Sequence, residues 1–138
     1  MHPNIVADNR TDLLTFTKTM FKARKGSGLL DNWHQDEICS ALERVVIGEC
    51  TRLIINIPPR SGKTEIAVIN FIAWCMGNFP DSEFIHASYS KRLAASNAYN
   101  GRAVMQNEAY QEIFSHTAIK SDSSAKDEFR TEQGGIVY

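Results

Sequence analysis

The segment from Pro58 to Thr64 contains residue types that bind phosphate. Gly62, Lys63 and Thr64 follow an apolar run and precede an amphipathic stretch. Glycine lets the backbone turn tightly and approach phosphate oxygens, and lysine reaches the β- and γ-phosphates of a nucleotide as a positive charge. A threonine hydroxyl at this position can ligate Mg²⁺. Because loop N–H groups and the N-terminus of the next helix attract the same anion, the pattern predicts a nucleotide-binding loop.

Consecutive residues form the predicted nucleotide-binding loop: Pro59, Arg60, Ser61, Gly62, Lys63, Thr64 and Glu65. The full pattern, G-x-x-x-x-G-K-[ST], requires a further glycine at the position where this chain has Ile57. Arg60 is an additional cation that can contact the γ-phosphate or pair with a surface carboxylate. The same residues also fit an ordinary strand–turn–helix connection in which Lys63 is solvated.

The elements that flank the loop have the order that such a site needs. Residues 52–57 are a short apolar run, rich in β-branched residues and without alternation, which predicts a central buried strand. After the loop, apolar residues recur at helical spacing over residues 63–76, and Gly77 and Pro80 end the predicted helix. A strand, a phosphate loop and a helix therefore follow one another.

The rest of the chain mixes predicted helices and strands. Helices are expected at residues 13–21, 33–47, 90–106 and 109–114, strands at 83–88 and in a hairpin at 129–138, and an exposed loop at 116–126. This order predicts an α/β fold in which helices flank the parallel sheet of a P-loop NTPase.

Composition limits the alternatives. The chain has 138 residues, a net charge of −1 and 43% hydrophobic residues, which fits one soluble globular domain. It has no global basic field for nucleic acid, so any such contact must use local Lys/Arg clusters. No apolar run approaches the ~20 residues of a membrane span, and no signal peptide is visible. Cys39, Cys50 and Cys75 lack CxxC spacing and are expected to be reduced thiols.

Several separated segments resemble the large terminase subunits of tailed bacteriophages and prophages. The resemblance includes residues 41–44 and 52–65, and the proline–arginine form of the loop is typical of that family, which accounts for the missing first glycine. It continues in residues 74–80, residues 87–94, Tyr110 with Ile113-Phe114, and Gly134-Gly135. These motifs occur in the family's order and cover roughly residues 30–138.

The resemblance implies the N-terminal segment of an ATP-driven DNA-packaging motor. Such proteins have an ATPase domain of the additional-strand (ASCE) P-loop type and a C-terminal RNase H-like nuclease that uses two metal ions. Residues 1–28 are then expected to form a helical lead-in, and residues 29–138 the N-terminal portion of the ATPase domain.

The resemblance also implies cofactors, partners and a location. The cofactors are ATP and Mg²⁺. The partners are double-stranded DNA, the portal protein, the small terminase subunit and further copies in a homo-oligomeric ring, with no membrane. The expected location is the host cell cytoplasm and, transiently, the portal vertex of the procapsid.

Roles in the loop follow residue by residue from the resemblance. Lys63 corresponds to the phosphate lysine, Gly62 to the turn glycine and Thr64 to the Mg²⁺ ligand. Arg60 corresponds to the arginine of the family's loop. Lys63 and Arg60 are therefore the expected catalytic residues.

Trp33, His34 and Gln35 stand where the family and related helicases place an adenine-recognition element. An amide such as that of Gln35 can both donate to and accept from the adenine edge. The ring of Trp33 can stack on a base or simply pack. The same residues also fit a helix start whose aromatic side chain is anchored in the core.

A second segment is expected to lie near DNA. Residues 88–90 follow the predicted strand 83–88 at its carboxyl edge, where ligands bind open α/β sheets, and the family has a helicase-like motif there. Lys91 and Arg92 can contact DNA phosphates or form a solvated helical turn. Arg102 can contact DNA or a neighbouring subunit, or lie on the helix surface.

One motif of a P-loop ATPase is missing from the sequence. After residue 65, no run of four apolar residues is followed by Asp or Glu. In a P-loop ATPase such a strand ends in an Asp that holds Mg²⁺, and a nearby Glu activates the attacking water. In the family this strand lies downstream of the Gly134-Gly135 region. We therefore expect a fragment of the architecture that binds nucleotide weakly at best and hydrolyses ATP poorly or not at all.

Other functions fit some of the same residues. A helicase-type ATPase or a P-loop kinase shares the Gly-Lys-Thr loop, although the Pro-Pro-Arg form and residues 74–80 favour the terminase family. A truncated, non-catalytic fragment would instead be a binding module for portal, small subunit, DNA or a host sensor. Nucleotide titration with an ATPase assay separates the enzyme from the binding module.

Overall fold

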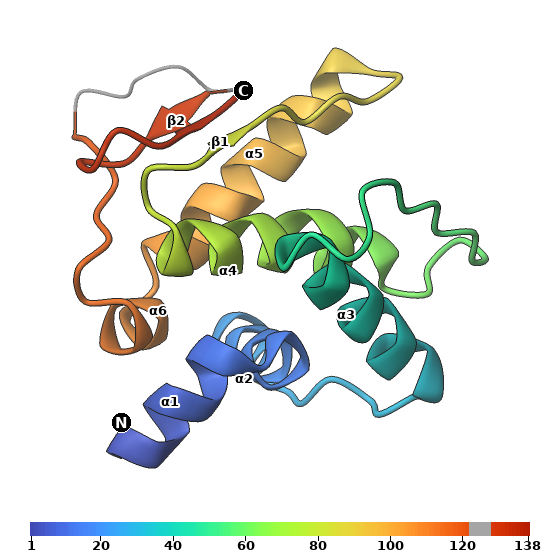
Figure 1. The fold of residues 1–138 in the computed structure, drawn as a ribbon, viewed down its shortest axis with the longest axis horizontal. Coiled ribbons are helices and arrows are strands. Elements are labelled where there is room, and N and C mark those ends of the chain that lie inside the picture. The colour runs from blue at the N-terminus through green and yellow to red at the C-terminus, as the bar shows by residue number, and fades with distance from the viewer. Residues whose placement is uncertain (122–127) are drawn as a thin grey trace.

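Helices make up most of the fold (Figure 1). The computed structural model describes residues 1–121 and 128–138. The helical elements are α1 (Pro3–Thr11), α2 (Leu13–Lys25), α3 (Trp33–Val46), the π-helical turn η1 (Glu65–Asn70), α4 (Phe71–Asn78), α5 (Lys91–Met105) and α6 (Glu108–Ile113). The strands are β1 (Glu83–Phe84), β2 (Phe129–Arg130) and β3 (Ile136–Val137). The fold is thus mixed α/β.

The helix that follows the predicted phosphate loop lies in the middle of the molecule (Figure 1). It is continuous from residue 63 to residue 78 through η1 and α4, which confirms the helix predicted at 63–76. Its buried apolar side chains are Ile66, Ile69, Ala73, Trp74, Cys75 and Met76. They allow the helix to contact α2, α3 and α5 at once, so the loop is fixed to the best-packed element of the core.

An aromatic cluster joins the N-terminal helices to the second half of the chain. Phe16 of α2 packs edge-on against Tyr110 and Phe114, with ring centroids 6.1 and 5.9 Å away. The Tyr110 hydroxyl donates to the Ala73 carbonyl at 2.9 Å. Gly77 is required beside this cluster, because a Cβ there would lie 2.5 Å from the Phe114 ring.

The sheet has three short strands in the order β1–β3–β2. β3 runs parallel to β1 and antiparallel to β2, with Phe129 opposite Val137. The hairpin predicted at 129–138 is confirmed. The strand predicted at 83–88 is confirmed at its start and ends as regular strand at Phe84, although the His86 N–H still donates to the Tyr138 carbonyl.

The prediction of a central buried strand at residues 52–57 is wrong. Within the described chain these residues pair with no strand, and Ile54 is 83% exposed. Leu53, Ile55 and Ile57 are partly buried against the core, so the segment alternates between a covered and a solvated side. A central strand needs partners on both edges, and the described residues supply none. The parallel sheet of a P-loop NTPase is therefore not shown.

The other predicted elements agree with the structure except at their ends. The four helices expected around α2, α3, α5 and α6 are confirmed, whereas α1 was not predicted as a separate helix within the helical lead-in expected at residues 1–28. In the loop expected at 116–126, Thr117 is fully buried and Ile119 forms a β-bridge with Thr131. Residues 122–126 of that loop lie outside the described residues. None of the described helices combines the length and apolar character needed to cross a membrane.

Candidate functional site

The loop before the central helix contains two residues with left-handed backbone. Arg60 has a φ of 62° and Gly62 a φ of 79°. Glycine adopts this conformation without a steric penalty, whereas a residue with a Cβ pays about 1 kcal/mol or more. The bend around Ser61 ends directly at the first turn of the helix. A helix N-terminus leaves N–H groups unpaired and favours anions, so the loop opens onto a surface suited to phosphate.

Lys63 joins the two ends of this bend. Its ammonium donates to the Ile57 carbonyl, with 3.1 Å between Nζ and the oxygen. The side chain is half-buried, so the positive charge is held at the loop. A phosphate oxygen would compete for this ammonium with one neutral carbonyl, and a charged acceptor forms the stronger hydrogen bond.

An open cleft of about 760 Å³ adjoins the loop. The walls are the connection between α2 and α3, the first turn of α3 and the loop itself: Phe21, Ser27, Gly28, Leu29, Leu30, Asp31, Asn32, His34, Gln35, Arg60, Ser61 and Gly62. Its volume lies in the ~300–1,000 Å³ range of small-molecule sites. The structure therefore places two predicted groups, the loop and the start of α3, beside one cleft.

Gln35 lies at this cleft with half of its amide unused. The residue is 6% exposed, and its Nε2 donates to the Leu30 carbonyl at 2.9 Å. Its Oε1 is buried and accepts no hydrogen bond from the described residues. An unpaired buried acceptor costs about 1–3 kcal/mol, so this oxygen is suited to a donor from a ligand or a water. The Gln35 amide was predicted both to donate to and to accept from a base. Because its Nε2 already donates to Leu30, only its oxygen is left to accept a hydrogen bond.

The other two residues of the predicted adenine element differ from each other. His34 lines the cleft, and its Nε2 lies 3.0 Å from the Ser61 carbonyl. Trp33 is 75% exposed and does not line the cleft, so it is not an anchor in the core. Its ring stands perpendicular to that of His34, with the centroids 6.3 Å apart.

Glu65, the last residue of the predicted loop, is engaged within the protein. Its carboxylate forms an ion pair with Arg24 of α2, and both side chains are largely buried. Asn70 donates to the Glu65 carbonyl at 2.8 Å and to the Glu65 carboxylate at 3.2 Å. These contacts span η1 and tie α2 to the helix after the loop. Arg24 and Asn70 thus hold the Glu65 carboxylate within the protein.

Thr64 and Pro59, by contrast, are exposed. The Thr64 hydroxyl caps no helix. No three His, Cys, Asp or Glu side chains in residues 1–121 and 128–138 lie close enough together to hold a metal ion. Because Mg²⁺ in nucleotide sites takes few protein ligands and shares phosphate oxygens, the role predicted for Thr64 does not require such a cluster.

The segment expected near DNA lies apart from the described cleft. Tyr89 is 96% exposed, and Lys91 and Arg92 are exposed in the first turn of α5. Arg102 donates to the Glu128 carbonyl at 2.9 Å and stacks over the Phe129 ring at 5.8 Å. Arg102 therefore fastens α5 to the residues before β2, which is a structural role.

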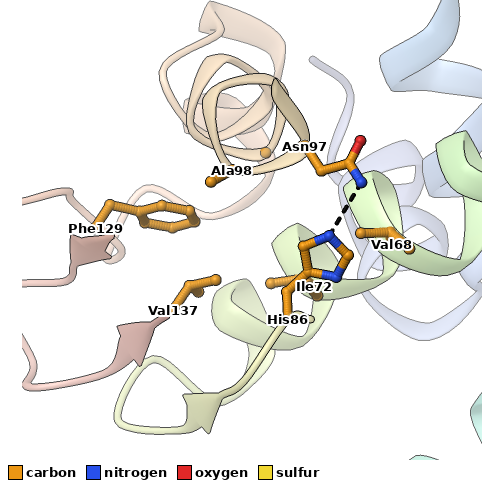
Figure 2. A pocket seen from close by; sticks show the side chains of 8 residues that line it. Val68, Ile72, His86, Asn97, Ala98, Phe129 and Val137 are labelled. Carbon is orange, nitrogen blue, oxygen red and sulfur yellow. Dashed lines mark hydrogen bonds between the residues drawn. The ribbon is translucent and has the colours of Figure 1, made fainter. Parts of the chain in front are cut away.

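A second cavity lies between α5, the central helix and the sheet (Figure 2). Its apolar wall includes Val68, Ile72 and Phe129, and His86 hydrogen-bonds Asn97 at 3.0 Å at its edge. The cavity holds about 10 Å³, roughly the space of one water molecule. It is too small for a substrate.

The cysteines are free thiols, as predicted. Cys39 and Cys75 are buried in the core, and this burial raises the pKa of each thiol to about 12. A thiol with so high a pKa is protonated at neutral pH and is a poor nucleophile. The two buried cysteines therefore pack as small apolar side chains.

Sequence reasoning missed one wall of the cleft and the clamp on Glu65. Ser27 and Gly28 line the cleft, although neither was predicted as a site residue. Lys18 and Asp31 form an ion pair at 2.7 Å that ties this wall to α2, and the hydrogen bond to Asp31 raises the pKa of Lys18. The pairing of Arg24 could not be predicted, because its partner Glu65 lies far away in the sequence.

No protein-family model, curated protein or solved structure matches the chain.

Proposed function

We propose that the chain binds ATP with Mg²⁺ at the loop of residues 57–64 and forms the N-terminal ATPase segment of a viral DNA-packaging motor, a terminase large subunit. One observation supports the binding site above all: Gly62 and Gln35 line the same cleft, and the buried Oε1 of Gln35 accepts no hydrogen bond from the described residues. A bend suited to phosphate and an amide suited to a base therefore adjoin one cleft.

The phosphates would bind at the bend. The N–H groups at the start of the central helix, the Lys63 ammonium and the exposed Arg60 guanidinium are donors suited to a triphosphate. Bound Mg²⁺ would supply charge neutralisation of the β- and γ-phosphates, and the exposed Thr64 hydroxyl is the protein group suited to hold it.

The base would lie toward the start of α3. Gln35 Oε1 can accept a hydrogen bond from the exocyclic amino group of adenine. A guanine presents a carbonyl oxygen at the corresponding position, which would face the Gln35 oxygen without a proton between them. The buried acceptor therefore favours ATP over GTP.

Hydrolysis by this chain is proposed to be slow. The carboxylate that follows Thr64 in the sequence is that of Glu65, which is held by Arg24 and Asn70. It is therefore not placed to activate a water molecule. The carboxylate of Asp31 also lines the cleft but is paired with Lys18. The proposed activity is therefore nucleotide binding, and turnover would need an acidic group placed to activate water.

The motor context rests on the resemblance of the sequence. Within it the chain would act with double-stranded DNA, the portal protein, the small subunit and further copies in a ring, in the host cytoplasm and at the procapsid portal. The exposed cations Lys91 and Arg92 are the local basic group proposed to contact DNA phosphates. A helicase-like ATPase uses the same nucleotide site.

Calorimetric titration of the chain with ATP and Mg²⁺ tests the binding site. We expect Lys63→Ala to weaken ATP binding by about tenfold or more, because it removes the charged donor at the loop. Lys120→Ala removes an exposed lysine outside the cleft and should leave the affinity unchanged. Equal affinity of wild type and Lys63→Ala, or no binding by the wild type, would contradict the proposal.

A further inference from the structure

The His34 side chain is bonded to the backbone of the phosphate loop. Its Nε2 lies 3.0 Å from the Ser61 carbonyl oxygen. A carbonyl oxygen only accepts hydrogen bonds, so Nε2 carries the proton and donates it. The contact joins the first turn of α3 to the middle of the bend, across 27 residues of sequence.

This bond fixes the orientation of one peptide plane. The peptide between Ser61 and Gly62 is trans, so its carbonyl and its N–H point in opposite directions. Holding the Ser61 carbonyl toward α3 therefore directs the Gly62 N–H away from α3. Because Gly62 has no Cβ, its backbone tolerates either orientation of this peptide. The local sequence therefore does not determine the orientation of the Ser61–Gly62 peptide, and the hydrogen bond from His34 does.

We propose that His34 is a positioning residue that orients the Gly62 N–H for phosphate binding. The proposal rests on the proposed nucleotide site and assigns His34 to the phosphates instead of the base. Its Nε2 is already bonded to the loop, whereas the buried Oε1 of the neighbouring Gln35 has no hydrogen-bond partner among the described residues. The two neighbouring residues thus have different roles. His34 orients the loop that binds the phosphates, and Gln35 accepts a hydrogen bond from the base.

Titration with inorganic tripolyphosphate separates these roles, because this probe has no base. His34→Phe keeps an aromatic ring but loses the donor, and we expect about five- to tenfold weaker binding of both tripolyphosphate and ATP. His34→Gln places an amide donor near the Nε2 position and should restore affinity to within about twofold. Gln35→Ala should weaken ATP binding and leave tripolyphosphate binding unchanged.

Amide NMR of the ligand-free chain provides a second readout that does not depend on nucleotide binding. The Gly62 resonance should shift in His34→Phe and in His34→Asn, whose amide ends closer to the backbone, and stay near its wild-type position in His34→Gln. The unfolding midpoint of each variant controls for folding, and His34→Asn replaces His34→Phe if the latter does not fold.

The outcomes are distinguishable. If the wild type binds neither ATP nor tripolyphosphate, the proposed function fails. If the wild type binds both and His34→Phe binds tripolyphosphate equally well, the positioning role fails, and a loss confined to ATP assigns His34 to the base. An unchanged Gly62 resonance in His34→Phe and His34→Asn overturns the positioning role whatever the nucleotide result.

Discussion

At the scale of single residues, Arg60 has an unfavourable backbone conformation but a side chain placed where a ligand would bind. It is the non-glycine residue with a positive φ among those described, and its guanidinium is exposed at the cleft. A left-handed arginine costs about 1 kcal/mol or more. Such strain persists where the surroundings impose it and often where a side chain is needed in one place.

Replacing Arg60 by glycine should therefore act in opposite directions on stability and binding. We expect Arg60→Gly to raise the free energy of unfolding by up to about 1 kcal/mol, because the left-handed conformation is no longer penalised, and to weaken ATP binding. Urea unfolding and calorimetry measure the two effects. Arg52→Gly is the matched control, because Arg52 is exposed and has no positive φ, and it should lose stability. A less stable Arg60→Gly protein would show that the strain argument is wrong.

Several residues of the candidate site could be predicted from sequence, but not the contacts between residues far apart along the chain. The bend at Gly62 and Lys63 follows from residue types and their order. The pairing of Arg24 with Glu65 and the bond from His34 to Ser61 span 41 and 27 residues and leave no local pattern. For Trp33 the residue type itself misleads, because tryptophan suggests burial but 75% of this side chain is exposed.

At the scale of elements, two helical glycines with different surroundings test how tightly the core is packed. Gly101 lies in the interior of α5, where an added Cβ would meet the Phe129 ring at 3.9 Å, an ordinary contact. A Cβ on Gly77 would meet the Phe114 ring at 2.5 Å. Phe114 is fully buried and packed against Phe16, so its ring has little room to give way.

We therefore expect alanine at these two positions to have opposite effects. Gly101→Ala should stabilise the protein by about 0.5–1 kcal/mol, because alanine favours the helix. Gly77→Ala should destabilise it by about 1–3 kcal/mol through overpacking. Chemical unfolding of the two variants measures both, and each serves as the control for the other. Equal stability of the two variants would contradict this account of the core.

Helices and the local hairpin could be predicted, whereas the strand expected at residues 52–57 could not. The apolar spacing of α2, α3, α5 and the central helix reports burial along one chain segment, so the pattern alone predicts them. Residues 52–57 have strand composition, but pairing depends on partners elsewhere, and the described chain offers none. The hairpin at 129–138 could be predicted because its two strands and its turn are adjacent in sequence.

At the scale of the whole molecule, extended segments with exposed apolar side chains lie at the surface. Ile54 is 83% exposed in residues 52–57, and Ile85 is 85% exposed just after β1. Unpaired backbone and apolar side chains along an extended segment are a template for pairing with another chain. These segments are the feature that would serve the alternative function, a non-catalytic binding module.

We expect concentrated protein to self-associate through these segments. Sedimentation velocity should show association that increases with concentration, and Ile54→Lys and Ile85→Lys should each reduce it, because a charge on an edge opposes strand pairing. Ile47→Lys introduces the same charge at a 68% exposed isoleucine outside both segments and should have no effect. A monomer at all concentrations would refute this expectation.

The loop also joins two parts of the chain whose amides differ in protection. Within the described residues, backbone amides of 52–57 donate to no other backbone group, whereas those of Phe71–Asn78 lie in a packed helix. Deuterium should therefore enter the segment before the bend within seconds and the helix after it far more slowly. A ligand bound in the bend should therefore be detected chiefly by slower deuterium uptake at the amides of residues 52–57.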